Sequence, residues 1–195
     1  MNKILPDLSR TAVLSMDLQT AIVSIYAKSV PDFLPRVASV LKEARERSMP
    51  VIHVQVGFRP GFPEVSERNQ LLGAIKTSTQ WQQVFQAAAG AIHPDVAPGN
   101  DEIVITKHRV NAFHGTDLEM ILRAKEIDTL VLFGIATSGV VLSTLLNASD
   151  ADYRLIVVKD CCMDNDAEVH ACLIEKVFTR RATVLSADEF CEALA

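Results

Sequence analysis

The sequence has no surplus of positive charge, because 24 Asp and Glu residues outnumber 19 Lys and Arg residues and give a formal net charge of −5. Nucleic acids and anionic membrane surfaces attract basic proteins, and no basic stripe or aromatic-rich basic segment is present. We therefore expect neither among the partners. No apolar run approaches the roughly 18 residues of a membrane-spanning helix, and residues 1–10 lack the apolar core of a signal peptide.

Cysteine is scarce and unevenly placed. The four cysteines, Cys161, Cys162, Cys172 and Cys191, all lie in the last quarter of the chain. A disulfide framework would distribute its cysteines more widely, so we expect reduced thiols and a cytoplasmic location. The sequence has no CxxC pair and no closely spaced histidine pair, and it therefore offers no zinc site.

The composition is that of a globular protein. Nearly half of the 195 residues are apolar and 22% are charged. The length suits one domain with a substantial core, and no internal repeat, low-complexity tract or linker divides the chain. We therefore predict a single domain over residues 1–195.

Six short, nearly continuous apolar segments predict strands that are buried on both faces, as in a parallel sheet. They span residues 11–16, 51–56, 102–106, 129–133, 155–158 and 182–185. Helical periodicity predicts helices over residues 32–48, 138–149 and 166–178, and after Thr116 and Ser186. This alternation predicts an α/β fold with three layers: a doubly wound, Rossmann-like, six-stranded parallel sheet with helices on both faces.

Local signals mark some boundaries. Thr116 with Glu119, and Ser186 with Glu189, have the spacing of a helix-capping box. Residues 57–80 contain Gly57, Pro60, Gly61 and Pro63 and show little periodicity, which predicts a long loop, often a lid or a binding loop.

Ligands of open parallel sheets bind beyond the carboxyl ends of the strands, so residues that leave strands are the candidates for a site. Asp17 follows the first strand and Lys107 the third. Opposite charges in a partly dry crevice tune each other's pKa, so Asp17 can act as a general acid or base and Lys107 can hold it ionised or stabilise an anion. A helix cap at Asp17 and an ordinary strand-end lysine at Lys107 are the structural alternatives.

A small, polar turn follows the fourth strand, formed by Gly134, Ile135, Ala136, Thr137, Ser138 and Gly139. Its backbone N–H groups lie at the start of a buried helix and suit an oxyanion or a carboxylate, although a tight strand-to-helix turn needs the same small residues. GIATSG lacks the GxGxxG spacing of a dinucleotide site.

Other side chains are weaker candidates. Phe58 and Arg59 lie in the long loop, where an arginine facing the pocket can hold an acidic substrate, and Phe113 follows Lys107 closely enough to line the pocket. Cys161 or Cys162, after the fifth strand, can supply a thiol, although a small buried residue in a turn is the simpler interpretation.

Three ordered segments carry a family resemblance. SMDLQ (15–19), ITKHRVNAFHGTDLEMILR (105–123) and LVLFGIATSGVVLST (130–144) together resemble the isochorismatase-like, or cysteine hydrolase, superfamily across nearly the whole chain. The resemblance implies a six-stranded parallel sheet and a pocket formed by an aspartate, a lysine and usually a cysteine. Asp17 and Lys107 occupy the first two positions, and we place Gln19, from the first segment, among the substrate-binding residues.

The third position departs from the family pattern. Amidase members continue the fourth strand with a pattern like GxxTxxCV; here Gly134 and Thr137 keep the frame, but Val140 stands at the cysteine position. Valine cannot attack a carbonyl. Members that cleave isochorismate also lack the cysteine, usually carry glycine there, and protonate an enol ether from the aspartate.

The resemblance therefore implies a small-molecule hydrolase that uses Asp17 and Lys107 by acid–base chemistry, without a covalent cysteine at Val140. Because valine is larger than glycine, the substrate need not be isochorismate. Two alternatives stay open: a catalytically silent binding or assembly protein on the same scaffold, and a hydrolase whose nucleophile is Cys161 or Cys162.

The resemblance also bears on cofactors and assembly. Metal-dependent relatives carry an Asp-x-His pair after the second strand, whereas this chain has only His53, which we interpret as a core residue. We expect no metal and no other cofactor. The resemblance further implies a cis peptide between Ile135 and Ala136 and a homodimer or homotetramer, for which the mean hydropathy of +0.19 leaves apolar surface.

Overall fold

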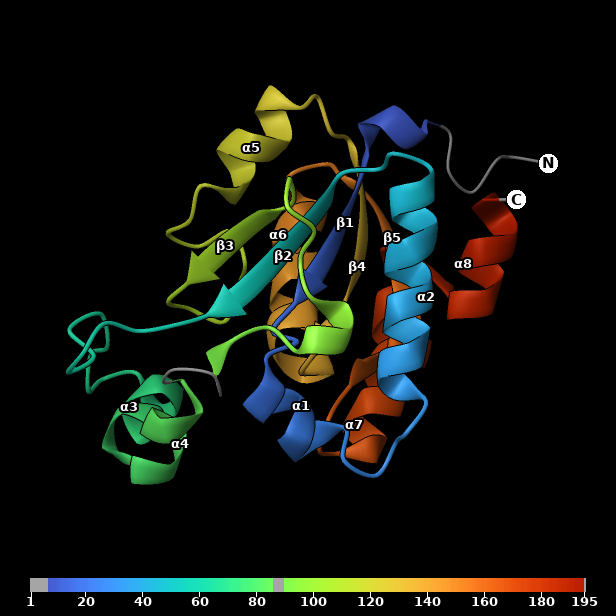
Figure 1. Ribbon diagram of the computed structural model, residues 1–195. Helices are drawn as coiled ribbons and strands as arrows, with labels where there is room; N and C mark the ends of the chain where they lie inside the picture. The colour runs from blue at the N-terminus through green and yellow to red at the C-terminus, as the bar shows by residue number, and fades with distance from the viewer. Residues whose placement is uncertain (1–6, 86–89, 195) are drawn as a thin grey trace.

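The computed structural model describes residues 7–85 and 90–194 (Figure 1). Six parallel strands form one sheet in the order β3-β2-β1-β4-β5-β6. The strands are β1 (Thr11–Met16), β2 (Val51–Val56), β3 (Ile103–Lys107), β4 (Thr129–Ile135), β5 (Arg154–Met163) and β6 (Thr183–Leu185). The predicted six-stranded parallel sheet is confirmed, and its strand order reverses between β1 and β4, the point at which such sheets bind ligands.

Helices surround the sheet. They are α1 (Thr20–Tyr26), α2 (Phe33–Glu46), α3 (Gln70–Thr77), α4 (Thr79–Val84), α5 (Leu118–Ala124), α6 (Leu142–Asp150), α7 (Ala167–Cys172) and α8 (Ala187–Leu194). Helix α2 packs with α8 over one face, and α6 lies behind the sheet in Figure 1. The apolar face expected of the second helix is buried as predicted: Phe33, Val37, Val40, Leu41 and Ala44 are all fully inaccessible to solvent.

The two central strands, β1 and β4, are buried at every residue. Gly134 lets them stay close at the end that carries the site. Its φ of 144° is disfavoured for L side chains, and a Cβ atom there would lie 2.1 Å from the carbonyl oxygen of Met16. Glycine is therefore required by a close backbone approach at this position.

Several predicted boundaries are wrong. Strand β5 continues to Met163, so Cys161 and Cys162 lie inside the strand and not in a turn after it. The helix expected from residue 138 begins as a π-helical turn (Thr137–Val141) before α6. The helix expected over 166–178 contains a second π turn (Leu173–Val177), followed by a short 3-10 segment (Phe178–Arg180).

Of the two predicted capping boxes, one forms. The Ser186 N–H donates to Glu189, and the Glu189 N–H donates back to the Ser186 hydroxyl. At α5 the Glu119 carboxylate instead pairs with Arg123, one turn along the helix. An arginine at i+4 gives that carboxylate a charged partner, which competes with the backbone N–H of Thr116.

The predicted long loop over residues 57–80 is wrong in its second half, which contains α3 and the start of α4. Both helices have side-chain caps: the Asn69 side chain accepts from the Leu72 N–H, and the Ser78 hydroxyl accepts from the Trp81 N–H. These caps supply partners for N–H groups that a short helix cannot satisfy itself. The glycines and prolines that suggested a loop all precede α3.

Candidate active site

Asp17 and Lys107 meet at the carboxyl edge of the sheet. Asp17 directly follows β1 with a φ of 56°, in the left-handed region that aspartate tolerates better than most residues, and its N–H donates to the carbonyl of Val54 (2.7 Å). Its carboxylate Oδ2 lies 2.7 Å from Nζ of Lys107. The same ammonium donates to the carbonyl of Arg109 (3.1 Å). Both charged residues are at least 95% inaccessible, so this is a buried ion pair.

The pair forms across a strand. Strand β2 lies between β1 and β3, and Lys107 is in register with Val56 at the end of β2. The long lysine stem therefore spans the end of β2 to reach Asp17. Gln19 holds that end in place: its amide nitrogen donates to the carbonyls of Val56 (3.0 Å) and Gly90 (2.6 Å), and its amide oxygen accepts from the Val56 N–H (2.8 Å).

The electrostatics of Asp17 favour proton exchange. Burial raises the pKa of its carboxyl above the ordinary value of 3.8, and this effect exceeds the opposing attraction and hydrogen bond of Lys107. Oδ1 is buried and has no hydrogen-bond partner within the described residues. A buried acceptor without a partner is costly, so a ligand that bonds to Oδ1 stabilises the site.

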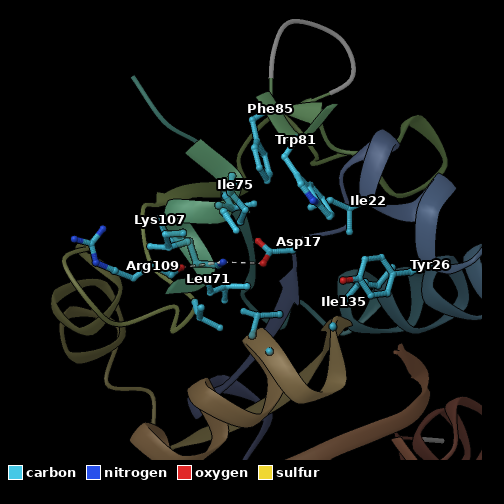
Figure 2. A pocket seen from close by; sticks show the side chains of 17 residues that line it. Asp17, Ile22, Tyr26, Leu71, Ile75, Trp81, Phe85, Lys107, Arg109 and Ile135 are labelled. Atoms are coloured by element: carbon cyan, nitrogen blue, oxygen red, sulfur yellow. Dashed lines mark hydrogen bonds and ion pairs between the residues drawn. The ribbon is translucent and has the colours of Figure 1, made fainter. Parts of the chain in front are cut away.

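A cavity of about 230 Å³ opens over the pair (Figure 2). Its lining comes from the carboxyl ends of β1 to β4 and from the segments around them: Asp17, Ile22, Tyr26, Val56, Leu71, Leu72, Ala74, Ile75, Trp81, Phe85, Lys107, Arg109, Val110, Ile135, Ala136, Gly139 and Val140. The peptide between Ile135 and Ala136 is cis, as the family resemblance implied. Val140 is buried and belongs to this lining, and so do Ile135, Ala136 and Gly139 from the predicted turn.

Six residues predicted to bind substrate lie outside this lining. Gln19 is occupied with backbone groups, as described above. Arg59 pairs with Glu64 (2.5 Å), and Phe58 packs against Phe62. The guanidinium of Arg59 is paired with a carboxylate of its own loop, and Arg59 therefore does not line the cavity. The remaining three, Phe113, Thr137 and Ser138, also have partners elsewhere: Tyr153, His170 and Asp164, respectively.

Three N–H groups at and just after the predicted turn already have partners. The Ser138 N–H donates to Asp164 (2.7 Å), and the N–H groups of Gly139 and Val141 both donate to the carbonyl of Ala136. These three donors are already used inside the protein. They offer nothing to an incoming oxyanion.

The apolar wall of the cavity was missed by sequence reasoning. It comes from α1, α3 and α4, and includes Ile22, Leu71, Ile75, Trp81 and Phe85. A signal for it was present: Leu71 and Ile75 are four residues apart, which puts them on one face of a helix, and Asn69 is a suitable cap for that helix.

The surroundings of Cys161 and Cys162 do not favour the cysteine alternative. Cys161 and Cys162 are fully buried in β5 and do not line the cavity. Burial raises the pKa of both thiols, that of Cys162 to about 12, and the Cys162 thiol donates to the carbonyl of Val158. Because only the thiolate is a good nucleophile, neither residue is suited to attack a substrate.

His53 lies in the core, as expected, with Nε2 2.9 Å from Glu102. Arg45 also binds that carboxylate through two nitrogens, and these contacts lower the pKa of Glu102 to about 2 although burial opposes them. Within residues 7–85 and 90–194, no three His, Cys, Asp or Glu side chains gather as they would around a metal ion. No helix in these ranges is long and apolar enough to span a membrane.

The sheet places a buried Asp–Lys pair and a cavity near the point where its strand order reverses, as in doubly wound α/β proteins that bind small ligands there. The Isochorismatase domain model matches residues 11–189, and the chain belongs to the isochorismatase family of small-molecule hydrolases.

Relatives match along most of their length. The isochorismatase family protein YecD of Escherichia coli O157:H7 is 31% identical, covering 94% of this chain and 96% of its own. Maleamate amidohydrolase of Pseudomonas putida is 29% identical over 75% of this chain and 67% of its own. The structure of an isochorismatase family protein from Burkholderia thailandensis superposes with a TM-score of 0.80 at 27% identity, covering 95% of this chain and 96% of that one.

Proposed function

We propose that this protein hydrolyses a small molecule by acid–base chemistry of Asp17, assisted by Lys107, without a covalent cysteine at position 140. The observation that carries the proposal is the carboxylate of Asp17 beside the cavity: its buried oxygen Oδ1 has no hydrogen-bond partner among the described residues, and its oxygen Oδ2 is bonded to the ammonium group of Lys107. A carboxyl in this setting has a raised pKa, which suits it to deliver a proton.

The reaction follows from these two groups. Protonated Asp17 transfers its proton to the atom of the substrate that gains electrons, and the carboxylate that results is stabilised by Lys107. A water molecule adds to the electrophilic carbon of the substrate and forms the new C–O bond. The Asp17 carboxylate then takes one proton from that water, and the acid is regenerated as the bond to the leaving group breaks.

The substrates to test first are amides, esters and enol ethers, because each is cleaved by water after proton transfer. The name of the P. putida relative, a maleamate amidohydrolase, favours amides as the starting set. Val140, which we assign to the family cysteine position, lines the cavity and has no nucleophilic atom, so the proposed route forms no acyl-enzyme.

The test is a turnover screen followed by Asp17→Asn and Lys107→Ala. We expect each change to lower kcat/KM by about 10²–10⁴-fold, the usual contribution of a general acid or base. Asp166→Asn is the matched control: it makes the same change to an exposed helix cap, where asparagine serves as well as aspartate. Wild-type turnover by Asp17→Asn would show that the mechanism is wrong, and absence of any turnover would favour the catalytically silent alternative.

The pH profile gives an independent check. The proton-donating form of Asp17 exists below its pKa, which burial raises above 3.8. The value of kcat/KM should therefore be constant at low pH and fall as the pH rises through that raised pKa. A profile with no falling limb above pH 4 would contradict a proton-donating role.

A further inference from the structure

Within the described residues, the cavity over Asp17 and Lys107 presents no unpaired charge beside Asp17. The ammonium of Lys107 is paired with Asp17 at 2.7 Å. The guanidinium of Arg109 points away from Asp17 in Figure 2 and donates to the carbonyls of His108 (2.6 Å) and Glu64 (3.0 Å). Among the described lining residues, Asp17 and Lys107 are therefore paired with each other, and Arg109 keeps its positive charge but holds its guanidinium away from Asp17.

The rest of the lining is apolar or neutral. Ile22, Leu71, Ile75 and Phe85 contribute hydrocarbon surface, and the polar side-chain groups beside them, the hydroxyl of Tyr26 and the indole N–H of Trp81, are uncharged. Burial raises the pKa of Tyr26, which keeps the hydroxyl protonated at neutral pH. These groups can bond to a neutral carbonyl, amide or ether but cannot balance a carboxylate.

The size of the cavity limits the ligand. An apolar cavity of about 150 Å³ is known to accommodate benzene. The volume of about 230 Å³ over Asp17 therefore accommodates one ring with a small substituent.

We propose that the substrate enters this cavity as an uncharged molecule with an apolar body the size of one ring, and that carboxylates of the same shape are rejected. The inference rests on the proposed hydrolase function only because it calls the ligand a substrate. The preference for an uncharged ligand follows from the cavity itself. A carboxylate would lose its hydration without gaining a counter-ion, and the carboxylate of Asp17 would repel it.

The proposal has a consequence for turnover. Hydrolysis of a neutral amide, with one water consumed, yields a carboxylate and ammonium. The product thus carries the charge that the cavity rejects, so it leaves readily and inhibits weakly.

Binding can be tested without turnover. Acetophenone and benzoate have nearly the same planar shape, neither is hydrolysed, and only benzoate is charged. Trp81 is the one tryptophan of the chain, so its indole N–H gives a single reporter signal in a ¹⁵N NMR titration. We expect acetophenone to shift that signal saturably, with a Kd at least 10-fold lower than that of benzoate.

Two variants make the charge argument sharper. Asp17→Asn leaves the Lys107 ammonium without its carboxylate, so benzoate should gain at least 10-fold in affinity while acetophenone changes little. Leu71→Arg places a cation at the exposed edge of the lining and should act in the same direction. Met120→Arg on α5, at an exposed apolar position outside the lining, should not.

Tighter binding of benzoate than of acetophenone by the wild-type protein would overturn the inference, as would an indole signal that neither compound moves. These outcomes are separate from the hydrolase proposal. Preference for acetophenone together with wild-type turnover by Asp17→Asn would leave the ligand class standing and remove the mechanism.

Discussion

The buried ion pair predicts a stability effect that depends on which partner is removed. In Lys107→Met, Asp17 keeps its burial but loses its counter-ion, whereas Asp17→Asn combined with Lys107→Met removes both charges. Asparagine is the suitable replacement at position 17, because it also tolerates the left-handed φ of 56° found there.

The magnitudes follow from the geometry. Two unit charges 2.7 Å apart attract by about 6 kcal/mol at an effective dielectric constant of about 20. Removing two charged groups from water costs several kcal/mol for each, so attraction and desolvation nearly cancel. We therefore expect Lys107→Met to lose about 3–5 kcal/mol of unfolding free energy, and the double variant to lie within about 1 kcal/mol of wild type or above it.

The assay is urea unfolding followed by circular dichroism, with Lys125→Met as the control for the same substitution at an exposed lysine. The pH dependence has a defined sign. Without Lys107 the native state binds the Asp17 proton more tightly than the unfolded state does, so the stability of Lys107→Met should rise as the pH falls through the raised pKa.

Two results would refute this reasoning. If the double variant is as unstable as Lys107→Met, the cost does not come from an uncompensated Asp17 charge. If Lys107→Met is as stable as wild type at neutral pH, the pair is more hydrated than its burial indicates.

Three further predictions concern the scaffold. Gly134→Ala should lower the free energy of unfolding by about 3 kcal/mol or more, through overlap with β1 and backbone strain, and wild-type stability in urea would contradict the close approach. Iodoacetamide should label exposed Cys172 in the native protein but spare Cys161 and Cys162, which mass spectrometry of peptides can show; early labelling of either would revive a thiol route. Ser186→Ala should cost about 1 kcal/mol by removing a helix cap, and a smaller loss than about 0.3 kcal/mol would mean that the cap is frayed.

The sheet and one end of the site could be predicted from the sequence, because both depend on local patterns. Buried parallel strands are nearly continuous apolar runs, and their carboxyl ends converge on one edge of the sheet. Asp17 and Lys107 each follow such a run. The pattern of apolar runs therefore indicates by itself that the two side chains lie at the same edge of the sheet. Val140 was located by its offset from Gly134 in a recognisable motif.

The rest of the site depended on tertiary contacts. Arg59 and Gln19 have the chemistry of ligand-binding residues. In the structure, however, Arg59 pairs with Glu64 in its own loop, and Gln19 forms hydrogen bonds with the end of β2. The apolar wall required α3 and α4 to fold back over Asp17, a packing that proline and glycine content in the preceding segment concealed.

What the sequence by itself determined is therefore the fold, the family and the position of the charged pair. Only the tertiary structure decided which side chains face the cavity, and that Asp17 and Lys107 are paired with each other there. The physical reason is that strand period and motif spacing are properties of neighbouring residues, whereas the partner of a polar group is chosen among all the groups that folding brings within reach.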